Sequence, residues 1–180
     1  MIDNKAKWDE KHKNAKRDSK PLAILEQYIS YAKKGKALDI ACGMGRNALF
    51  MRDCGFFVDC VDISEFAINA LHNRQNLNPI LADLENYQIL KNSYEAICVS
   101  YFLERKLYSP IKEGLKKGGV LFFETFLKDE NSKYNAKMNP AYLLEKNELL
   151  KEFIDFEILY YESKIIEANE SLVASLVARK

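Results

Sequence analysis

The sequence predicts an α/β fold, a doubly wound parallel sheet with helices on both faces, and three observations carry this prediction. Short apolar runs alternate with helix-like segments through most of the chain, and the connections between them are brief. Such alternation is typical of parallel strands joined by helical crossovers. A Gly-x-Gly turn at Gly43 and Gly45 follows the apolar run 37–41, as a loop between a buried strand and a helix does. Near the end of the chain the alternation stops, and two long strand-like runs follow one another.

Local signals place the individual elements. Pro21 begins a predicted helix over residues 22–32, whose apolar side chains recur at helical spacing. The Ser109-Pro110 pair begins a later helix, which is expected to stop at Gly118-Gly119. Further helices are predicted over 46–54, 65–73 and 145–153, and strands over 37–41, 57–61, 79–82, 94–99 and 120–123.

The last two strand-like runs span 156–166 and 171–178 and are joined by the tight turn 167–170. Two strands joined by so short a turn must be antiparallel. A dinucleotide-binding fold would continue instead with another helical crossover. The sequence therefore predicts a parallel sheet that is completed by an antiparallel hairpin.

Composition limits the classes of function. A chain of 180 residues with 48% hydrophobic and 29% charged residues is typical of one soluble globular domain. A net charge of +1 gives no general attraction to nucleic acids or acidic membranes. No apolar run is long enough to span a bilayer, and the polar start does not resemble a signal peptide. We therefore expect a cytoplasmic monomer or homodimer with no nucleic-acid or membrane partner.

Cysteine and histidine usage argues against a metal site. The four cysteines, Cys42, Cys54, Cys60 and Cys98, lie at irregular spacings, and three of them lie in or beside apolar runs. Buried, reduced thiols are the ordinary interpretation of this pattern. With two histidines and no Cys-x-x-Cys pair, no metal is expected.

Two carboxylates mark the predicted binding site. Asp39 lies four residues before Gly43, and Asp62 ends the next apolar run, 17 residues after Gly45. An acid at the end of the second strand suits hydrogen bonds to the two hydroxyls of a ribose. The charge of Asp39 would repel a pyrophosphate but attract, directly or through water, the ammonium of an amino acid. These features indicate a nucleoside cofactor that carries an amino acid.

At this point the stretch from Ala37 to Ala48 resembles the first motif of class I S-adenosylmethionine-dependent methyltransferases. Further stretches resemble the small tellurite-resistance and thiopurine-type bacterial members of that class. They include Val61-Asp62-Ile63-Ser64, Glu124-Thr125-Phe126 and Trp8-Asp9-Glu10-Lys11-His12. The resemblance implies a seven-stranded sheet in the order 3-2-1-4-5-7-6 with strand 7 antiparallel. It also implies S-adenosylmethionine as the cofactor.

The resemblance also implies roles for single residues. Gly43 and Gly45 match glycines beside the methionine part of the cofactor, and Asp62 matches the acid that binds the ribose. Ile63 matches an apolar residue on the adenine face, and Asp83 with the Leu84 amide matches the pair that contacts the adenine edge. The full expected cofactor set is Asp39, Ala41, Gly43, Gly45, Arg46, Asn47, Asp62, Ile63, Asp83, Leu84, Ser100 and Tyr101.

Catalytic groups are expected around the methyl acceptor. The candidates are His12, Tyr101, Arg105 and Glu124, and Glu124 is alternatively a structural partner of Arg105. Residues 1–20 are densely charged around Trp8 and form either a helical lid over the cofactor or a frayed tail. Residues 21–180 form the methyltransferase domain in this prediction. Acceptor selection is expected from the lid and the loop 127–140.

The predicted function is methyl transfer from S-adenosylmethionine to a small molecule such as a thiol or a chalcogen oxyanion. A non-catalytic regulatory protein that binds S-adenosylmethionine is one alternative. An NAD(P)-binding oxidoreductase is another, and Asp39 and the terminal hairpin disfavour it. Ser100-Tyr101-Phe102 replaces the Asn/Asp-Pro-Pro-aromatic motif of enzymes that methylate amines in nucleic acids, and no Pro-Cys nucleophile is present there.

Overall fold

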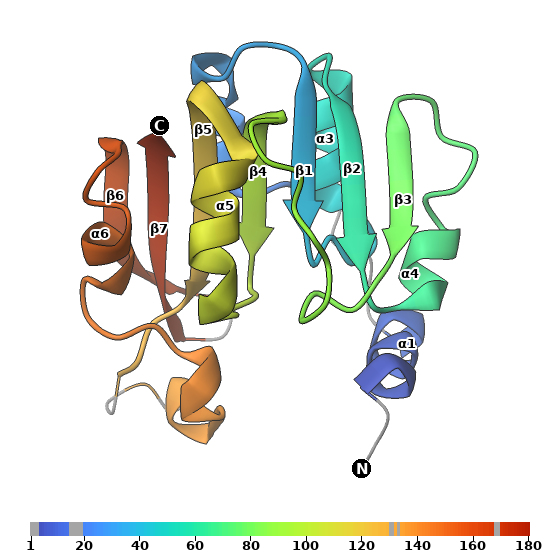
Figure 1. Ribbon diagram of the computed structural model, residues 1–180. Coiled ribbons are helices and arrows are strands. Elements are labelled where there is room, and N and C mark those ends of the chain that lie inside the picture. The colour runs from blue at the N-terminus through green and yellow to red at the C-terminus, as the bar shows by residue number, and fades with distance from the viewer. Residues whose placement is uncertain (1–3, 15–19, 130–131, 133, 168–169) are drawn as a thin grey trace.

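A computed structural model describes residues 4–14, 20–129, 132, 134–167 and 170–180. Their strands form one sheet in the order β3-β2-β1-β4-β5-β7-β6 (Figure 1). The strands are β1 (Lys36–Ile40), β2 (Phe57–Asp62), β3 (Leu77–Leu81), β4 (Tyr94–Ser100), β5 (Leu115–Phe126), β6 (Glu157–Ile166) and β7 (Ser171–Arg179).

Strand directions match the prediction from the sequence. The pairs β1–β2, β1–β4, β2–β3 and β4–β5 are parallel. Strand β7 lies between β5 and β6 and is antiparallel to both. The seven-stranded order and the antiparallel seventh strand are therefore confirmed.

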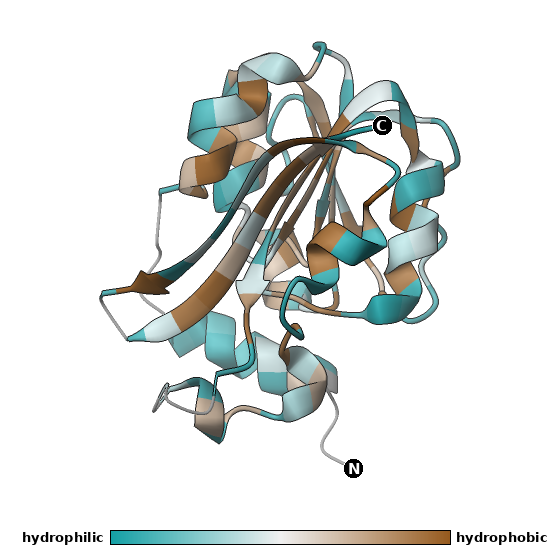
Figure 2. Cartoon of the chain, turned by 90° about the vertical axis from the view of Figure 1, so that its left-hand side faces the viewer, coloured by the Kyte–Doolittle hydropathy of each residue, from teal (hydrophilic) through white to brown (hydrophobic). Residues whose placement is uncertain are grey.

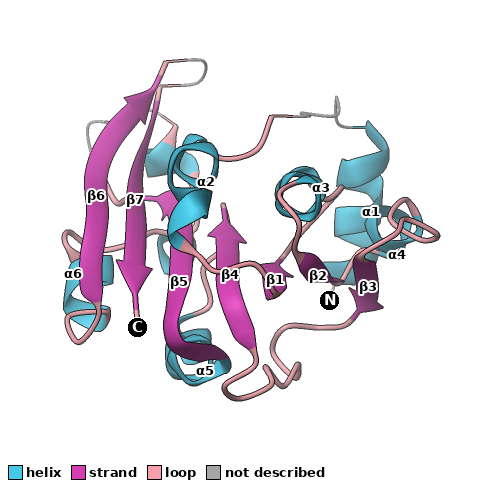
Figure 3. Ribbon diagram, turned by 90° about the horizontal axis from the view of Figure 1, so that it is seen from above, coloured by secondary structure: helices cyan, strands magenta, loops and turns pink. Residues whose placement is uncertain are grey.

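Helices cover both faces of the sheet (Figure 3). The α-helices are α1 (Asn4–Asn14), α2 (Ala23–Tyr28), α3 (Arg46–Asp53), α4 (Glu65–Asn69), α5 (Tyr108–Gly114) and α6 (Glu148–Glu152). Short 3-10 helices span Ile29–Tyr31, Arg105–Leu107, Asn135–Lys137 and Pro140–Tyr142.

The sheet separates two buried apolar layers. On one face, Leu25 of α2 and Met51 of α3 pack with Val58 of β2, and all three are fully buried. On the other face, Ile111 of α5 and Phe153, which directly follows α6, pack against the sheet. Figure 2 shows the same arrangement, with hydrophobic strands inside and hydrophilic segments on the outer helices. Burial on both faces explains why the parallel strands read as continuous apolar runs.

Four predicted helices differ from the structure by more than one residue. The helix predicted over 65–73 ends at Asn69, and the one predicted over 22–32 spans only Ala23–Tyr28, with a 3-10 helix at Ile29–Tyr31 after it. The helix expected to run to Gly118-Gly119 ends at Gly114, because Leu115 already pairs with Tyr94 as the first residue of β5. Gly118, at φ 81°, lies inside this strand, where the ladder with β4 is irregular. The glycine pair therefore marks a distortion of a strand and not a helix end.

The helix predicted over 145–153 begins only at Glu148. Asn147 has a left-handed backbone at φ 61°, so the helix cannot extend before it. The Glu148 carboxylate instead accepts a hydrogen bond from the Glu145 N–H at 2.8 Å. The predicted hairpin turn 167–170 includes residues 168 and 169, which lie outside the described residues.

Candidate functional site

A cavity of about 550 Å³ lies at the carboxyl ends of the central strands, where α/β sheets bind ligands. Helix α1 and the segment 134–142 supply two of its walls, and Figure 1 shows both below the strand ends. The predicted site residues that line it are His12, Ala41, Gly43, Arg46, Asp62, Ile63, Asp83, Leu84, Ser100 and Tyr101. Five predicted residues do not line it: Asp39, Gly45, Asn47, Arg105 and Glu124.

The turn between β1 and α3 forms the floor of the cavity. Ala41, Gly43 and Gly45 all have left-handed backbones, at φ 55°, 51° and 79°. A Cβ on Gly45 would lie 2.6 Å from Cδ2 of Leu71, so this glycine allows the turn to pack on the chain after α4. Gly43 faces the cavity, where its nearest side chain is His12. The turn therefore presents bare backbone to a ligand.

Asp62 joins this turn to the end of β2. One carboxylate oxygen accepts a hydrogen bond from the Gly43 N–H at 2.8 Å, and the other accepts one from the Ser64 N–H at 2.9 Å. The residue is 6% exposed and lines the cavity. Each carboxylate oxygen has a second lone pair, so Asp62 can also accept hydrogen bonds from ligand hydroxyls.

Asp39 lies behind this turn and not in the cavity, contrary to its predicted place beside the cofactor. Its side chain is fully buried, and Oδ2 accepts a hydrogen bond from the Ala48 N–H at 3.0 Å. Oδ1 has no hydrogen-bond partner within the described part of the chain. Burial raises the pKa of Asp39 from 3.8 to about 7. The carboxylate thus anchors the start of α3.

Asn47 also contacts other protein groups and not the cavity, as does Gly45, which packs against Leu71. The Asn47 side chain accepts a hydrogen bond from the Leu22 N–H and donates one to the Ser100 hydroxyl, each at 3.0 Å. Asn47 is 1% exposed. These contacts tie α3 to the segment before α2 and to the end of β4, so Asn47 supports the site from behind.

Helix α1 forms the opposite wall, where the sequence predicted a lid or a tail over residues 1–20. Its residues Lys7, Trp8, Lys11 and His12 line the cavity. The Trp8 and His12 rings are stacked with centroids 5.9 Å apart. Burial lowers the pKa of His12, so the ring is neutral near pH 7. Residues 1–3 and 15–19 of the predicted lid lie outside the described residues.

Aromatic side chains form the wall at the ends of β4 and β5. The ring of Phe126 lies 5.2 Å from that of Tyr101 and 5.6 Å from that of Tyr134. Tyr101 has a left-handed backbone at φ 52°, which is uncommon for a non-glycine residue. Its hydroxyl donates a hydrogen bond to Glu124 Oε1 at 3.0 Å. Burial and the Glu124 charge raise the pKa of Tyr101, so the phenol stays protonated at neutral pH.

Glu124 lies behind Tyr101 and is 3% exposed. Its other oxygen accepts a hydrogen bond from the Ser175 hydroxyl at 2.6 Å, and Lys164 Nζ lies 3.6 Å away. Glu124 therefore reaches the cavity only through Tyr101.

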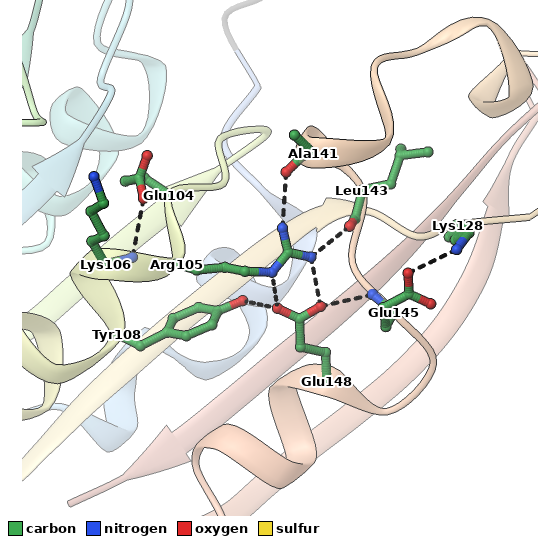
Figure 4. Close-up of polar contacts among 9 residues, drawn as sticks. All are labelled: Glu104, Arg105, Lys106, Tyr108, Lys128, Ala141, Leu143, Glu145 and Glu148. Carbon is green, nitrogen blue, oxygen red and sulfur yellow. Dashed lines mark hydrogen bonds and ion pairs between the residues drawn. The ribbon is translucent and has the colours of Figure 1, made fainter.

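Arg105 does not pair with Glu124, so that alternative from the sequence is wrong. The guanidinium binds both carboxylate oxygens of Glu148, at 2.8 and 2.9 Å, and the carbonyls of Ala141 and Leu143 (Figure 4). Tyr108 also donates a hydrogen bond to Glu148 at 2.7 Å. Arg105 is thus a clamp on the segment that carries Tyr142, and it lies outside the cavity.

Several residues that line the cavity were not predicted as site residues from the sequence. They are Lys7, Lys11, Cys42, Met44, Glu85, Phe102, Leu103, Glu104, Phe126, Tyr134, Met138 and Tyr142. The loop 127–140 was expected to select the acceptor, and two of these residues, Tyr134 and Met138, belong to it. Its residues 130, 131 and 133 lie outside the described ranges. Phe126 could have been predicted from the sequence, because it directly follows Glu124-Thr125 at the end of a strand.

Two further findings concern the described ranges alone. They contain no group of three or more His, Cys, Asp or Glu side chains that could hold a metal ion. None of their helices is both long and apolar enough to cross a membrane.

Comparison with known proteins gives the family. Residues 4–171 match the family described as TehB, tellurite resistance protein TehB. The chain is 28% identical over 142 residues to hemagglutinin 1 of Eikenella corrodens, covering 72% of this chain and 46% of that protein. It therefore spans less than half the length of this relative.

Solved structures show the same fold. The crystal structure of TehB from Haemophilus influenzae is similar with a TM-score of 0.74 and 22% identity, covering 98% of this chain and 66% of that one. A SAM-dependent methyltransferase from Methanosarcina mazei is similar with a TM-score of 0.71 and 19% identity, covering 89% and 98%. The chain belongs to the TehB family and has the fold of class I S-adenosylmethionine-dependent methyltransferases.

Proposed function

We propose that this chain transfers a methyl group from S-adenosylmethionine to a small molecule whose acceptor atom is a thiol sulfur or the chalcogen of an oxyanion. The observation that carries the proposal is the Asp62 carboxylate beside the backbone of Gly43, both lining the cavity at the ends of two adjacent parallel strands. Membership of the TehB family over most of the chain supports it.

The residues in the cavity fit an adenosine ligand. Asp62 would accept hydrogen bonds from the ribose hydroxyls, and Ile63 and Leu84 offer apolar contact to the adenine. Asp83 would accept a hydrogen bond from the adenine amino group. A side chain at Gly43 would occupy space on the cavity side of the turn, since its Cβ would lie 3.0 Å from the His12 ring. This bare backbone suits close approach by the ligand.

The far half of the cavity fits the methionine end. Ser100 ends β4 and Tyr101 follows it, and both line the cavity, where their carbonyls would accept hydrogen bonds from an ammonium group. Arg46 also lines the cavity at the start of α3, and its guanidinium lies 5.4 Å from the Tyr101 ring. It would bind a carboxylate there.

The aromatic wall supports a soft acceptor. When bound, S-adenosylmethionine supplies a methyl group that is already activated on a sulfonium. The protein then has to align an acceptor lone pair with the sulfur–methyl bond, and such positioning contributes roughly 7–11 kcal/mol in well-oriented reactions. Tyr101, Phe126 and Tyr134 offer ring surfaces to a polarisable sulfur or heavier chalcogen. His12 is a neutral base within the same cavity for an acceptor that must lose a proton.

The test is release of S-adenosylhomocysteine from S-adenosylmethionine with a panel of acceptors. The panel contains thiols, selenite, tellurite, amines and carboxylates, and a reaction without acceptor gives the background. We expect turnover with thiols or chalcogen oxyanions. Binding of S-adenosylhomocysteine with no turnover of any acceptor would favour the regulatory alternative. Tighter binding of NAD than of S-adenosylhomocysteine would contradict the proposal altogether.

A further inference from the structure

Helix α1 is attached to α4 through Asp9. Oδ1 of Asp9 accepts a hydrogen bond from the Ser64 hydroxyl at 2.6 Å and another from the Phe66 N–H at 3.0 Å. These bonds lower the pKa of Asp9, which keeps it ionised at neutral pH. The Lys5–Glu65 ion pair, at 2.7 Å, lies on the same contact. Figure 1 shows α1 directly below α4 at the carboxyl end of β2.

The same short loop also holds Asp62. The Ser64 N–H donates to Asp62 while the Ser64 hydroxyl donates to Asp9, so one residue contacts both carboxylates. Asp62 in turn accepts a hydrogen bond from the Gly43 N–H. A continuous series of hydrogen bonds therefore runs from the glycine turn through Asp62 and Ser64 to α1. Any group that binds Asp62 acts on a loop that also positions α1.

Asp9 fixes which side of α1 faces the cavity. With Asp9 on Ser64 and Phe66, the cavity receives Trp8 and His12. Helix α1 offers little apolar surface for docking, because six of its eleven residues are charged and only Ala6 and Trp8 are apolar. With few apolar contacts, the hydrogen bonds of Asp9 and the Lys5–Glu65 ion pair restrain this helix.

We propose that Asp9 is a positioning residue that makes α1 a wall of the cofactor site, so that α1 docking and cofactor binding strengthen each other. The identity of the ligand rests on the proposed function, whereas the attachment of α1 does not. Coupling of this kind is reciprocal: if docked α1 tightens cofactor binding, bound cofactor must stabilise docked α1 by the same factor.

The experiment uses Trp8, the chain's single tryptophan, as a reporter on α1. S-adenosylhomocysteine is titrated into the wild type and the variants Asp9→Ala, Asp9→Asn and Glu10→Gln, with Trp8 fluorescence and calorimetry as readouts. Glu10 is the matched control, because it lies on the same helix, is exposed, and its side chain has no hydrogen bond or ion pair with other described residues.

Asp9→Ala is expected to raise the dissociation constant at least tenfold and to abolish the Trp8 response to ligand. Asp9→Asn keeps a side-chain oxygen that accepts both hydrogen bonds, so it is expected to stay within threefold of the wild type. A weak Asp9→Ala together with a near-wild-type Asp9→Asn would therefore assign the loss of affinity to the two hydrogen bonds. Equal affinity of Asp9→Ala and the wild type, with an unchanged Trp8 response, would overturn the proposal.

Amide exchange without ligand separates this proposal from the proposed function. In the unliganded protein, Asp9→Ala is expected to speed exchange in residues 4–14 and to leave β1 and β4 unchanged. Unchanged exchange in α1 would show that Asp9 does not hold the helix, whatever the cofactor. Faster exchange in α1 together with a wild type that does not bind S-adenosylhomocysteine would support the attachment and contradict the proposed function alone.

Discussion

The Gly43 N–H donates a hydrogen bond to Asp62 Oδ2 at 2.8 Å, so the end of β2 holds the turn that follows β1. The carboxylate is thereby oriented before any ligand arrives. Pre-orientation reduces the entropy that a binding partner must remove.

Asp62→Ala is expected to weaken binding of S-adenosylhomocysteine roughly 100-fold, or about 3 kcal/mol, since hydrogen bonds to charged groups contribute about 1.5–3 kcal/mol each. Calorimetric titration measures the change, and the urea unfolding midpoint checks the fold. Glu85→Gln is the control, because Glu85 is another carboxylate that lines the cavity. A folded Asp62→Ala protein with unchanged affinity would show that Asp62 serves only the backbone.

Ala41 and Gly45 predict changes of opposite sign in the free energy of unfolding. Ala41 has φ 55°, a conformation that costs an L residue about 1–2 kcal/mol, whereas glycine's greater freedom costs about 0.5–1 kcal/mol. Ala41→Gly is therefore expected to stabilise the protein by about 0.5–1 kcal/mol. Gly45→Ala adds a Cβ 2.6 Å from Leu71 at φ 79° and is expected to destabilise it by about 1–3 kcal/mol.

Urea unfolding curves of both variants measure these effects. Changes of the same sign, or a loss of stability in Ala41→Gly, would contradict the strain at the turn.

Asp39 predicts a pH dependence of stability. Burial raises its pKa in the folded protein to about 7, above the ordinary value of 3.8. Between these values the folded state holds a proton that the unfolded state has lost. The contribution of Asp39 to the free energy of unfolding therefore falls as pH rises from about 4 to about 7 and is constant outside this window.

Asp39→Asn removes this titration, so stability is expected to fall less steeply between pH 4 and pH 7 than in the wild type. Unfolding curves at several pH values give the two slopes. Parallel slopes for the two proteins would show that Asp39 does not titrate in this range.

Removal of the Arg105 side chain is expected to loosen the wall formed by 134–142 and to leave cofactor binding unchanged. Burial opposes ionisation of Glu148, but hydrogen bonds from Arg105, the Glu145 N–H and Tyr108 hold its pKa below the ordinary value. Arg105→Ala removes the clamp and is expected to cost roughly 1–2 kcal/mol of stability, since the pair is partly exposed. Amide exchange is expected to speed up in 139–148, while binding of S-adenosylhomocysteine stays unchanged.

Arg105→Lys is a useful second variant, because an ammonium cannot form the forked contact with a carboxylate and two carbonyls. A large loss of cofactor affinity in either variant would place Arg105 in the cofactor site instead.

The sequence was sufficient for the sheet because its signals are local. Apolar runs, the turn glycines and the Ser64 cap each act within a few residues, and Ser64 does cap α4. The error at Leu115 arose because glycine is compatible with both a helix end and an irregular strand. Only pairing with Tyr94, a distant residue, decides between them.

Contacts between side chains that are far apart in the chain could not be predicted from a single sequence. Arg105 pairs with Glu148, 43 residues away, and not with the predicted Glu124. Asp9 binds Ser64 and Phe66 across more than 50 residues. Asp39 lies four residues before Gly43, as the motif requires. However, β1 lies between β2 and β4, and the Asp39 side chain is buried behind the turn, where it contacts the start of α3. Charge alone did not reveal which way that side chain faces.

The aromatic wall has a practical consequence, because the backbone of its segment 134–142 is held by hydrogen bonds near both ends. Asn135 donates hydrogen bonds to the carbonyls of Leu127 and Leu172, and Arg105 holds the carbonyls of Ala141 and Leu143. The cavity-facing side chains of this stretch, Tyr134, Met138 and Tyr142, take part in none of these attachments. We therefore expect that a combinatorial library can vary these three side chains while the cofactor half of the cavity stays intact. If this wall selects the acceptor, as proposed, acceptor preference is expected to change with them.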